Sequence, residues 1–162
     1  MKVPSSPITV PENTSPVFPV NLDMNGVTLR YSTARLMARV EDNGIPCFVF
    51  CEEKGIKPEF QFAAENKVKT SSLSKQYGSA VSYYPRPSRG FAMTVTAGGE
   101  EKAHVILLSR QDAECAWRLN FAGKPRLLIS NANVIIDSGK MELSSANAFM
   151  NLTIFPRIKK LF

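Results

Sequence analysis

Apolar and polar residues alternate along most of the chain with the period of a β-strand. Residues 27–31 (Val-Thr-Leu-Arg-Tyr) alternate as expected of a strand with one buried face. Residues 47–51 (Cys-Phe-Val-Phe-Cys) form an unbroken apolar run, which is typical of a strand buried on both faces. The same reasoning predicts further strands at 36–41, 56–63, 91–97, 103–108, 126–129, 134–136, 141–143 and 149–155.

Turn residues separate these strands. Asp42-Asn43-Gly44 supplies residues that tolerate positive φ, and Gly98-Gly99 joins residues 91–97 and 103–108 into a predicted hairpin. Residues 65–80 are polar and predict either a long loop or weak edge strands.

One segment has the pattern of a helix. Ser109-Arg110-Gln111-Asp112 resembles a capping box, in which the Ser109 hydroxyl and the Asp112 carboxylate bond the first free amides. Ala113, Ala116 and Trp117 follow at helical spacing. We therefore predict a short helix over 110–118, with Trp117 on its apolar face and favoured as a core residue.

Many short strands, frequent turns and one small helix predict an all-β fold, either a sandwich or a barrel. We favour a jelly-roll-like β-sandwich of mostly antiparallel strands. An α/β fold is disfavoured because no crossover helices separate the strands.

Residues 1–19 hold five of the eleven prolines and predict an extended lead-in or linker. The predicted sandwich spans 20–156, and residues 157–162 form a basic stub.

Composition and charge describe an ordinary soluble domain. Hydrophobic residues make up 44% and charged residues 21% of 162 residues. A spanning helix needs about 20 consecutive apolar residues, and no such run occurs, so no membrane partner is expected. The net charge of +6 lies mainly in residues 82–162, which hold eleven basic and six acidic side chains.

The best local cluster of candidate binding residues lies in this basic half. Arg86 and Arg89 follow Tyr83 and Tyr84 closely, so the four could form an anion-binding or ring-stacking surface. The remaining positive charge is scattered, which favours a solvated surface over a nucleic-acid site.

The sequence offers little catalytic chemistry. It has no phosphate-binding glycine motif and no nucleophile elbow, and His104 is the single histidine. In its strand, His104 is favoured as a hydrogen-bonded or edge residue. Glu59, between Pro58 and Phe60, is the carboxylate best placed to have buried partners, but a structural role is favoured. We predict no catalytic residue and no cofactor.

The three cysteines predict buried thiols. Cys47 and Cys51 share one face of a predicted strand at a separation of roughly 13 Å, whereas a disulfide needs Cα atoms within about 7 Å. The spacing resembles no zinc site, because Cys115 lacks a nearby thiol or imidazole partner in the sequence and His104 stands alone. The redox compartment stays open.

Most of residues 20–155 resemble a segment of bacterial β-galactosidase-like enzymes of glycoside hydrolase family 35. The resemblance begins with the stretch Asn21-Leu22-Asp23-Met24-Asn25-Gly26-Val27-Thr28-Leu29-Arg30-Tyr31-Ser32-Thr33-Ala34-Arg35. It continues through residues 45–50, 55–62, 104–113, 116–118 and 126–130 and the strand pair that follows.

The resemblance implies an accessory role. In that family a (β/α)8 barrel performs retaining hydrolysis with two glutamates, and β-rich modules follow it in the chain. This sequence resembles one of those modules and has no segment matching the catalytic glutamates, so no catalytic residue is carried over. The implied partner is the barrel of a parent chain, and the module alone is not expected to hydrolyse a substrate. A periplasmic or secreted parent fits the resemblance, although residues 1–7 have no signal-peptide pattern and the compartment stays open.

Two alternatives remain. The first is an independent carbohydrate-binding module that holds galactose-containing glycans through Tyr83, Tyr84, Arg86 and Arg89, by ring stacking and hydrogen bonds. The second is a basic β-barrel that binds single-stranded nucleic acid, whose affinity would fall steeply with salt. The scattered charge and the single tryptophan disfavour the second.

Overall fold

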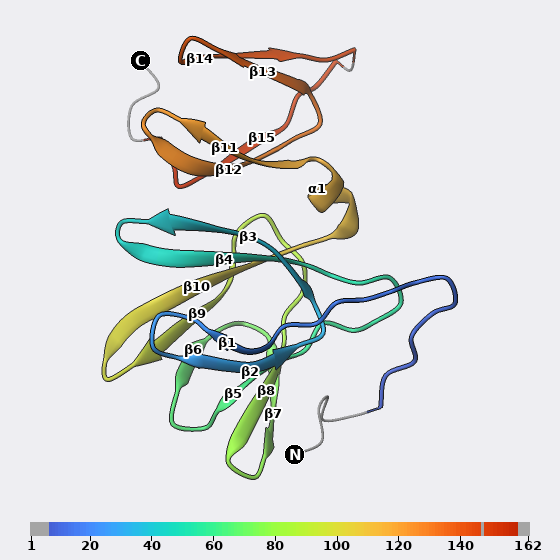
Figure 1. The fold of residues 1–162 in the computed structure, drawn as a ribbon, viewed down its shortest axis with the longest axis vertical. Helices are drawn as coiled ribbons and strands as arrows, with labels where there is room; N and C mark the ends of the chain where they lie inside the picture. Colours follow the sequence, from blue (N-terminus) through green and yellow to red (C-terminus); the bar gives the residue numbers. More distant parts are fainter. Residues whose placement is uncertain (1–6, 147, 159–162) are drawn as a thin grey trace.

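The computed structural model describes residues 7–146 and 148–158, which form fifteen strands and one short helix (Figure 1). Residues 1–6 of the expected lead-in and 159–162 of the expected stub lie outside the described residues. The elements are β1 Val20–Asp23, β2 Thr28–Ser32, β3 Arg35–Asp42, β4 Ile45–Cys51, β5 Phe60–Ala63, β6 Lys67–Lys69, β7 Leu73–Tyr77, β8 Ala80–Tyr84, β9 Phe91–Ala97, β10 Glu100–Leu108, α1 Arg110–Glu114, β11 Ala116–Phe121, β12 Lys124–Ser130, β13 Asn133–Asp137, β14 Lys140–Ser144 and β15 Leu152–Phe155.

Two five-stranded sheets face each other. Their strand orders are β1-β2-β5-β8-β7 and β3-β4-β10-β9-β6, and every pair of neighbours except β4 and β10 is antiparallel. An apolar core that includes Leu29, Phe50, Phe60, Phe62 and Leu107 fills the space between them. The predicted all-β sandwich of mostly antiparallel strands is confirmed.

The sheet that contains β4 and β10 is buried on both faces. Phe48 and Phe50 of β4 belong to the core between the two sheets, whereas Cys47 and Val49 point to the other side. There they meet a second apolar cluster, which β12 completes with Leu127 and Ile129. The run at 47–51 is therefore apolar throughout because its strand is buried on both faces, as predicted.

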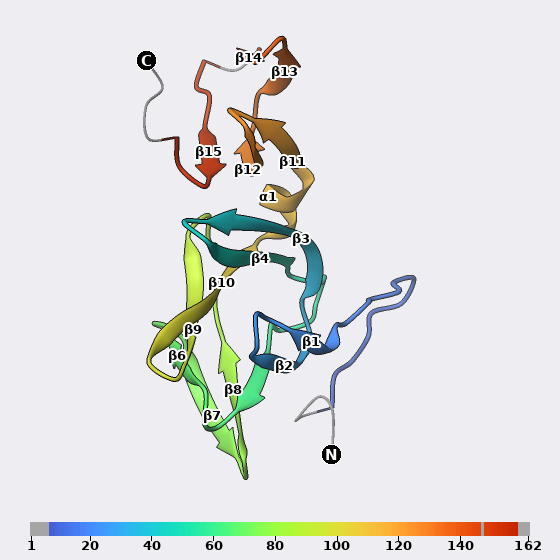
Figure 2. The ribbon, with the colours of Figure 1, turned by 60° about the vertical axis from the view of Figure 1, so that its left-hand side comes forward.

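Further layers extend the molecule along its long axis. β11, β12 and β15 form a three-stranded sheet next to β3 and β4, and the β13–β14 hairpin lies beyond it (Figures 1 and 2). Arg118 Nε in β11 donates to the Arg39 carbonyl in β3 over 3.3 Å. The first strand begins at Val20 and the last ends at Phe155. The assignment of residues 20–156 to a single module stays a prediction.

The predicted turns form where expected. Asn43 and Gly44 between β3 and β4 have φ values of 51° and 84°, which a tight hairpin turn with two left-handed residues requires. β9 and β10 form the predicted hairpin through Gly98 and Gly99. The polar stretch at 65–80 contains β6 and β7, which are edge strands of the two different sheets.

The helix lies at the predicted place but is shorter than predicted. Ser109 Oγ accepts the Asp112 amide over 3.1 Å, so the N-cap is confirmed, yet α1 ends at Glu114. From Ala116 the chain forms β11, in which Trp117 pairs with Leu128 and is 41% exposed. The core position predicted for Trp117 is wrong. α1 buries no residue, so continuing it would gain little, whereas β11 gains a full antiparallel ladder with β12.

Within the described ranges, no helix has the length and apolar character needed to cross a membrane.

Candidate functional site

The four predicted binding residues do not share one surface. Tyr83 is buried in the sandwich core, with its ring 6.2 Å from that of Phe62. Tyr84, the next residue of β8, is half-buried and faces a cleft. Arg86 is exposed between β8 and β9, whereas Arg89 lines a different cleft. Successive residues of a strand point to opposite faces, so Tyr83 and Tyr84 cannot form one platform.

Tyr84 lines a cleft of about 640 Å³, which we call the tyrosine cleft. Tyr77 of the neighbouring strand β7 also lines it, and the two hydroxyl oxygens are 3.5 Å apart. Lys57 Nζ lies 4.5 Å from the centre of the Tyr84 ring, and Lys75 Nζ lies 5.0 Å from that of Tyr77. Each ring is therefore placed for a cation–π contact.

Glu59 supplies the carboxylate of the tyrosine cleft. It is 5% exposed, and its Oε1 accepts the Tyr31 hydroxyl over 2.5 Å and the Tyr84 hydroxyl over 3.5 Å. Thr33 fixes the backbone: its Oγ1 accepts the Glu59 amide over 2.8 Å, and its own amide donates to the Glu59 carbonyl over 2.9 Å. The end of β2 thereby holds Glu59 just before β5, as a positioned acceptor.

The tyrosine cleft has the chemistry of a site for a neutral polar ring. Two aromatic rings offer flat surfaces, Glu59 offers an acceptor, and Lys57 and Lys75 offer donors. Glycoside hydrolysis by the common mechanism uses two facing carboxylates. Among the described residues that line this cleft, Glu59 is the one acidic side chain. The arrangement is therefore suited to binding.

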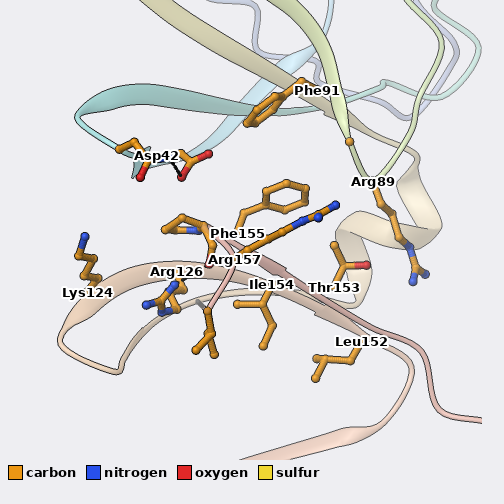
Figure 3. A pocket seen from close by; sticks show the side chains of 14 residues that line it. Asp42, Arg89, Phe91, Lys124, Arg126, Leu152, Thr153, Ile154, Phe155 and Arg157 are labelled. Carbon is orange, nitrogen blue, oxygen red and sulfur yellow. Dashed lines mark hydrogen bonds between the residues drawn. The ribbon is translucent and has the colours of Figure 1, made fainter. Parts of the chain in front are cut away.

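A larger cleft of about 1190 Å³ lies between the β3–β4 turn and the β11–β12–β15 sheet, and we call it the interlayer cleft (Figure 3). Arg89 reaches this region from the connection before β9. Its Nε and Nη2 donate to Asp112 Oδ1 over 2.9 and 2.7 Å, which ties the sandwich to α1. The Asp112 carboxylate thus binds an arginine from another element, whereas the sequence predicted that it would cap the helix.

Arg126 and Phe91 also line the interlayer cleft. Arg126 is only 6% exposed, and its Nε and Nη1 donate to the carbonyls of Phe121 and Pro156 over 2.8 and 2.5 Å. The Phe91 ring lies 5.8 Å from that of Phe155. The Phe91 ring also stacks on the His104 ring, with ring centres 4.2 Å apart and planes 9° from parallel.

His104 is hydrogen-bonded, as its strand position predicted. Its Nδ1 lies 3.1 Å from Thr94 Oγ1, and its Nε2 lies 3.9 Å from a Glu101 carboxylate oxygen. Burial lowers the pKa of His104 below its usual value, although the charges of Glu101 and Asp42 oppose the shift. The ring is therefore mainly neutral at pH 7, and it supports Phe91 beneath the cleft.

Two of the three cysteines behave as small buried side chains. Cys47 and Cys51 are free and buried, as predicted, whereas Cys115 is free but only half-buried, so the predicted burial is wrong for Cys115. Burial, with a smaller contribution from the Asp42 charge, raises the pKa of Cys47 to about 12. The described part of the chain holds no group of three or more potential metal ligands.

Sequence reasoning missed Tyr77, Lys57 and Arg126 as site residues. Tyr77 lies in the polar stretch at 65–80, and its signal is an aromatic residue directly before Gly78. Lys57 and Arg126 carry no local signal, because the sheet order alone brings them to their clefts.

Comparison of the chain with protein-family models and with the sequences of curated proteins finds no match. The likeness to glycoside hydrolase family 35 therefore depends on the segments quoted above.

Proposed function

We propose that the chain is a non-catalytic β-sandwich module of a β-galactosidase-like glycoside hydrolase and supports the catalytic barrel of that enzyme. The resemblance of residues 20–155 to that family motivates the proposal, and the all-β sandwich fits it. One structural observation carries it. Large apolar side chains remain exposed beyond the second cluster, including Ile135 at 56%, Phe149 at 83% and Met150 at 52%. A partner that covered these side chains would remove their apolar surface from water, which favours association.

The test combines the purified chain with a separately expressed family 35 barrel that has been stripped of its own β-modules. We expect the two to elute together in size-exclusion chromatography, and the barrel to melt at a higher temperature in the complex. The variant Ile135→Asp should weaken the complex, because it places a charge in the apolar surface. Lys140→Asp, a change on the same hairpin outside the apolar positions, serves as the control.

Two results would contradict this proposal. Hydrolysis of a nitrophenyl galactoside by the purified chain alone would make it an enzyme. Separate elution of chain and barrel at concentrations of about 100 µM would exclude a supporting contact of useful affinity.

The tyrosine cleft favours a second candidate function, the independent binding of galactose-containing glycans. Tyr77 and Tyr84 offer ring faces beside the Glu59 acceptor in one concave site. Ring stacking with a few hydrogen bonds predicts a Kd of roughly millimolar order. Titration with a galactose-containing oligosaccharide should move the amide resonances of residues 57, 59, 77 and 84 in a heteronuclear NMR spectrum.

The variant Tyr84→Ala should abolish this binding, and Arg86→Ala, at an exposed site outside both clefts, should leave it unchanged. A spectrum that does not move with millimolar sugar would reject this second function and leave the supporting role.

A further inference from the structure

β15 is an outer strand whose open edge runs along the interlayer cleft. Among the strands that the structure describes, it pairs with β12 alone, so alternate N–H and C=O groups of β15 point away from the sheet. Thr153 and Phe155 share the sheet face of Leu127 and Ile129, whereas Leu152 and Ile154 lie on the opposite face. All four line the cleft (Figure 3). Residues on both faces of one strand can line a single cleft only where the cleft runs along the edge of that strand.

This edge also lacks the usual protection. Natural sheets commonly place charged residues on outer strands, which discourages another chain from pairing there. β15 has the uncharged sequence Leu-Thr-Ile-Phe. Among the described strands, every other strand at the end of a sheet carries at least one charged residue; these are β1, β3, β6, β7, β11, β13 and β14. β15 is therefore the edge most open to strand addition.

The cleft beside β15 is positively charged. Lys124, Arg126 and Arg157 line it, whereas Asp42 is the one acidic side chain among its described lining residues. Arg89 also lines it, but its charge is matched by Asp112. Within the described ranges, no carboxylate lies within ion-pair distance of Lys124, Arg126 or Arg157. Arg126 is nine-tenths buried, and its Nε and Nη1 are satisfied by the Phe121 and Pro156 carbonyls. These carbonyls offset part of the cost of burial but leave the positive charge itself without an anion. An acidic group in the cleft would relieve this cost.

We propose that the open edge of β15 binds an extended acidic peptide segment, which adds to the β11–β12–β15 sheet as a further strand. The main-chain groups of β15 supply the hydrogen bonds, and the cleft cations select the negative charge. A second copy of this chain is a poor occupant, because both copies would bring a basic cleft and a net charge of +6 to the contact. The regular spacing of donors and acceptors along a strand edge favours a peptide over an acidic saccharide. This inference does not depend on the proposed function.

The experiment titrates the full chain with a short capped peptide of alternating valine and glutamate and follows its amides by NMR. We expect saturable shifts at residues 152–155, together with slower hydrogen exchange of the outward amides of β15, which become hydrogen-bonded. A peptide of alternating valine and lysine is the matched control for charge and should not bind measurably. Affinity for the glutamate peptide should fall as salt is raised.

Two variants test the charge selection without changing the fold. Arg157 and Arg86 are both exposed. Arg157→Glu should weaken binding of the glutamate peptide by roughly fivefold or more, as expected for the loss of an exposed ion pair and the gain of a repulsive charge. Arg86→Glu makes the same change in net charge outside the cleft and should leave the affinity unchanged.

Four outcomes would overturn the proposal. The first two are equal binding of the two peptides and unchanged hydrogen exchange in β15 despite binding. The third is tighter binding of an oligogalacturonate than of the glutamate peptide at the same residues. The fourth is a concentration-dependent dimer in which β15 is protected without any peptide.

Discussion

At the scale of single residues, Glu59 links the end of β2 to the tyrosine cleft. Replacing it with alanine removes the carboxylate that accepts the hydroxyl of the fully buried Tyr31. Leaving such a donor without this acceptor costs about 1–3 kcal/mol. We therefore expect Glu59→Ala to lower the free energy of unfolding in urea by that amount.

Glu59→Gln retains an amide oxygen that can accept the same hydroxyl, so its loss should be smaller. Tyr31→Phe combined with Glu59→Ala should cost less than the sum of the single changes, because the two residues interact directly. Additive losses would show that the hydrogen bond between them contributes nothing to stability.

Cys47 predicts a specific dependence of stability on pH. In the unfolded chain its thiol ionises near the ordinary pKa of 9.0, whereas in the folded chain burial holds the pKa at about 12. Between these values the unfolded state loses a proton that the folded state keeps. Stability should therefore fall as pH rises above 9, by up to about 1.4 kcal/mol per pH unit from this group.

The measurement compares urea unfolding of the parent chain and Cys47→Ala from pH 8 to pH 11. Other groups titrate in both proteins, so the difference between the two slopes isolates Cys47. Parallel slopes would mean that the Cys47 thiol ionises equally easily in the folded chain.

The residue scale also shows where the sequence is insufficient for the site. Tyr83 and Tyr84 are adjacent, and the sequence suggested one platform; the alternation of a strand instead places one ring in the core and the other in a cleft. The sequence indicates Glu59 as the carboxylate best placed to have buried partners, because Pro58 and Phe60 flank it. Its partners Tyr31 and Tyr84 come from β2 and β8, and only the sheet order brings them together.

At the scale of elements, the N-cap of α1 is the feature most open to a direct test. Ser109 Oγ accepts the Asp112 amide, and removing an N-cap hydroxyl costs about 0.5–2 kcal/mol. We expect Ser109→Ala to destabilise the chain by an amount in this range and to speed hydrogen exchange of the Asp112 amide. Ser88→Ala removes a hydroxyl whose two bonds with Gly90, one donated and one accepted, are exposed and 3.4 Å long, so it should have little effect. Equal losses in the two variants would contradict the capping role.

Elements were predictable where local pattern and burial agree. The apolar run of β4, the β3–β4 turn and the β9–β10 hairpin all follow from residues close in sequence. Trp117 was misplaced because a few residues at helical spacing cannot show that a neighbouring strand, β12, offers a better partner. The parallel pairing of β4 with β10 has no local signal, since the two strands are far apart in the chain.

At the scale of the whole molecule, the second apolar cluster joins the sandwich to the three-stranded sheet. Ile129 lies fully buried in it, and truncation of such a side chain to alanine costs about 2–5 kcal/mol. Ile129→Ala should lower stability by this amount and shift the unfolding of both layers together. Trp117 fluorescence reports the three-stranded sheet, and far-UV circular dichroism reports all strands, so the two urea transitions should coincide.

The exposed Ile135→Ala is the matched control and should change stability by less than about 0.5 kcal/mol. Separate transitions for the two probes would show that the layers unfold independently.

The parallel contact between β4 and β10 has a consequence for biosynthesis. β4 ends at Cys51, but the strand that covers its second edge begins only at Glu100, and β12 follows later still. While the ribosome makes the intervening residues, β4 has only β3 beside it in its sheet. The face that carries Cys47 and Val49 lacks its later neighbours in the second cluster, which include Ile106, Leu127 and Ile129. We expect the nascent chain to be a client of general chaperones over this interval, since late contacts between distant segments are slow to form and leave apolar strands exposed to aggregation.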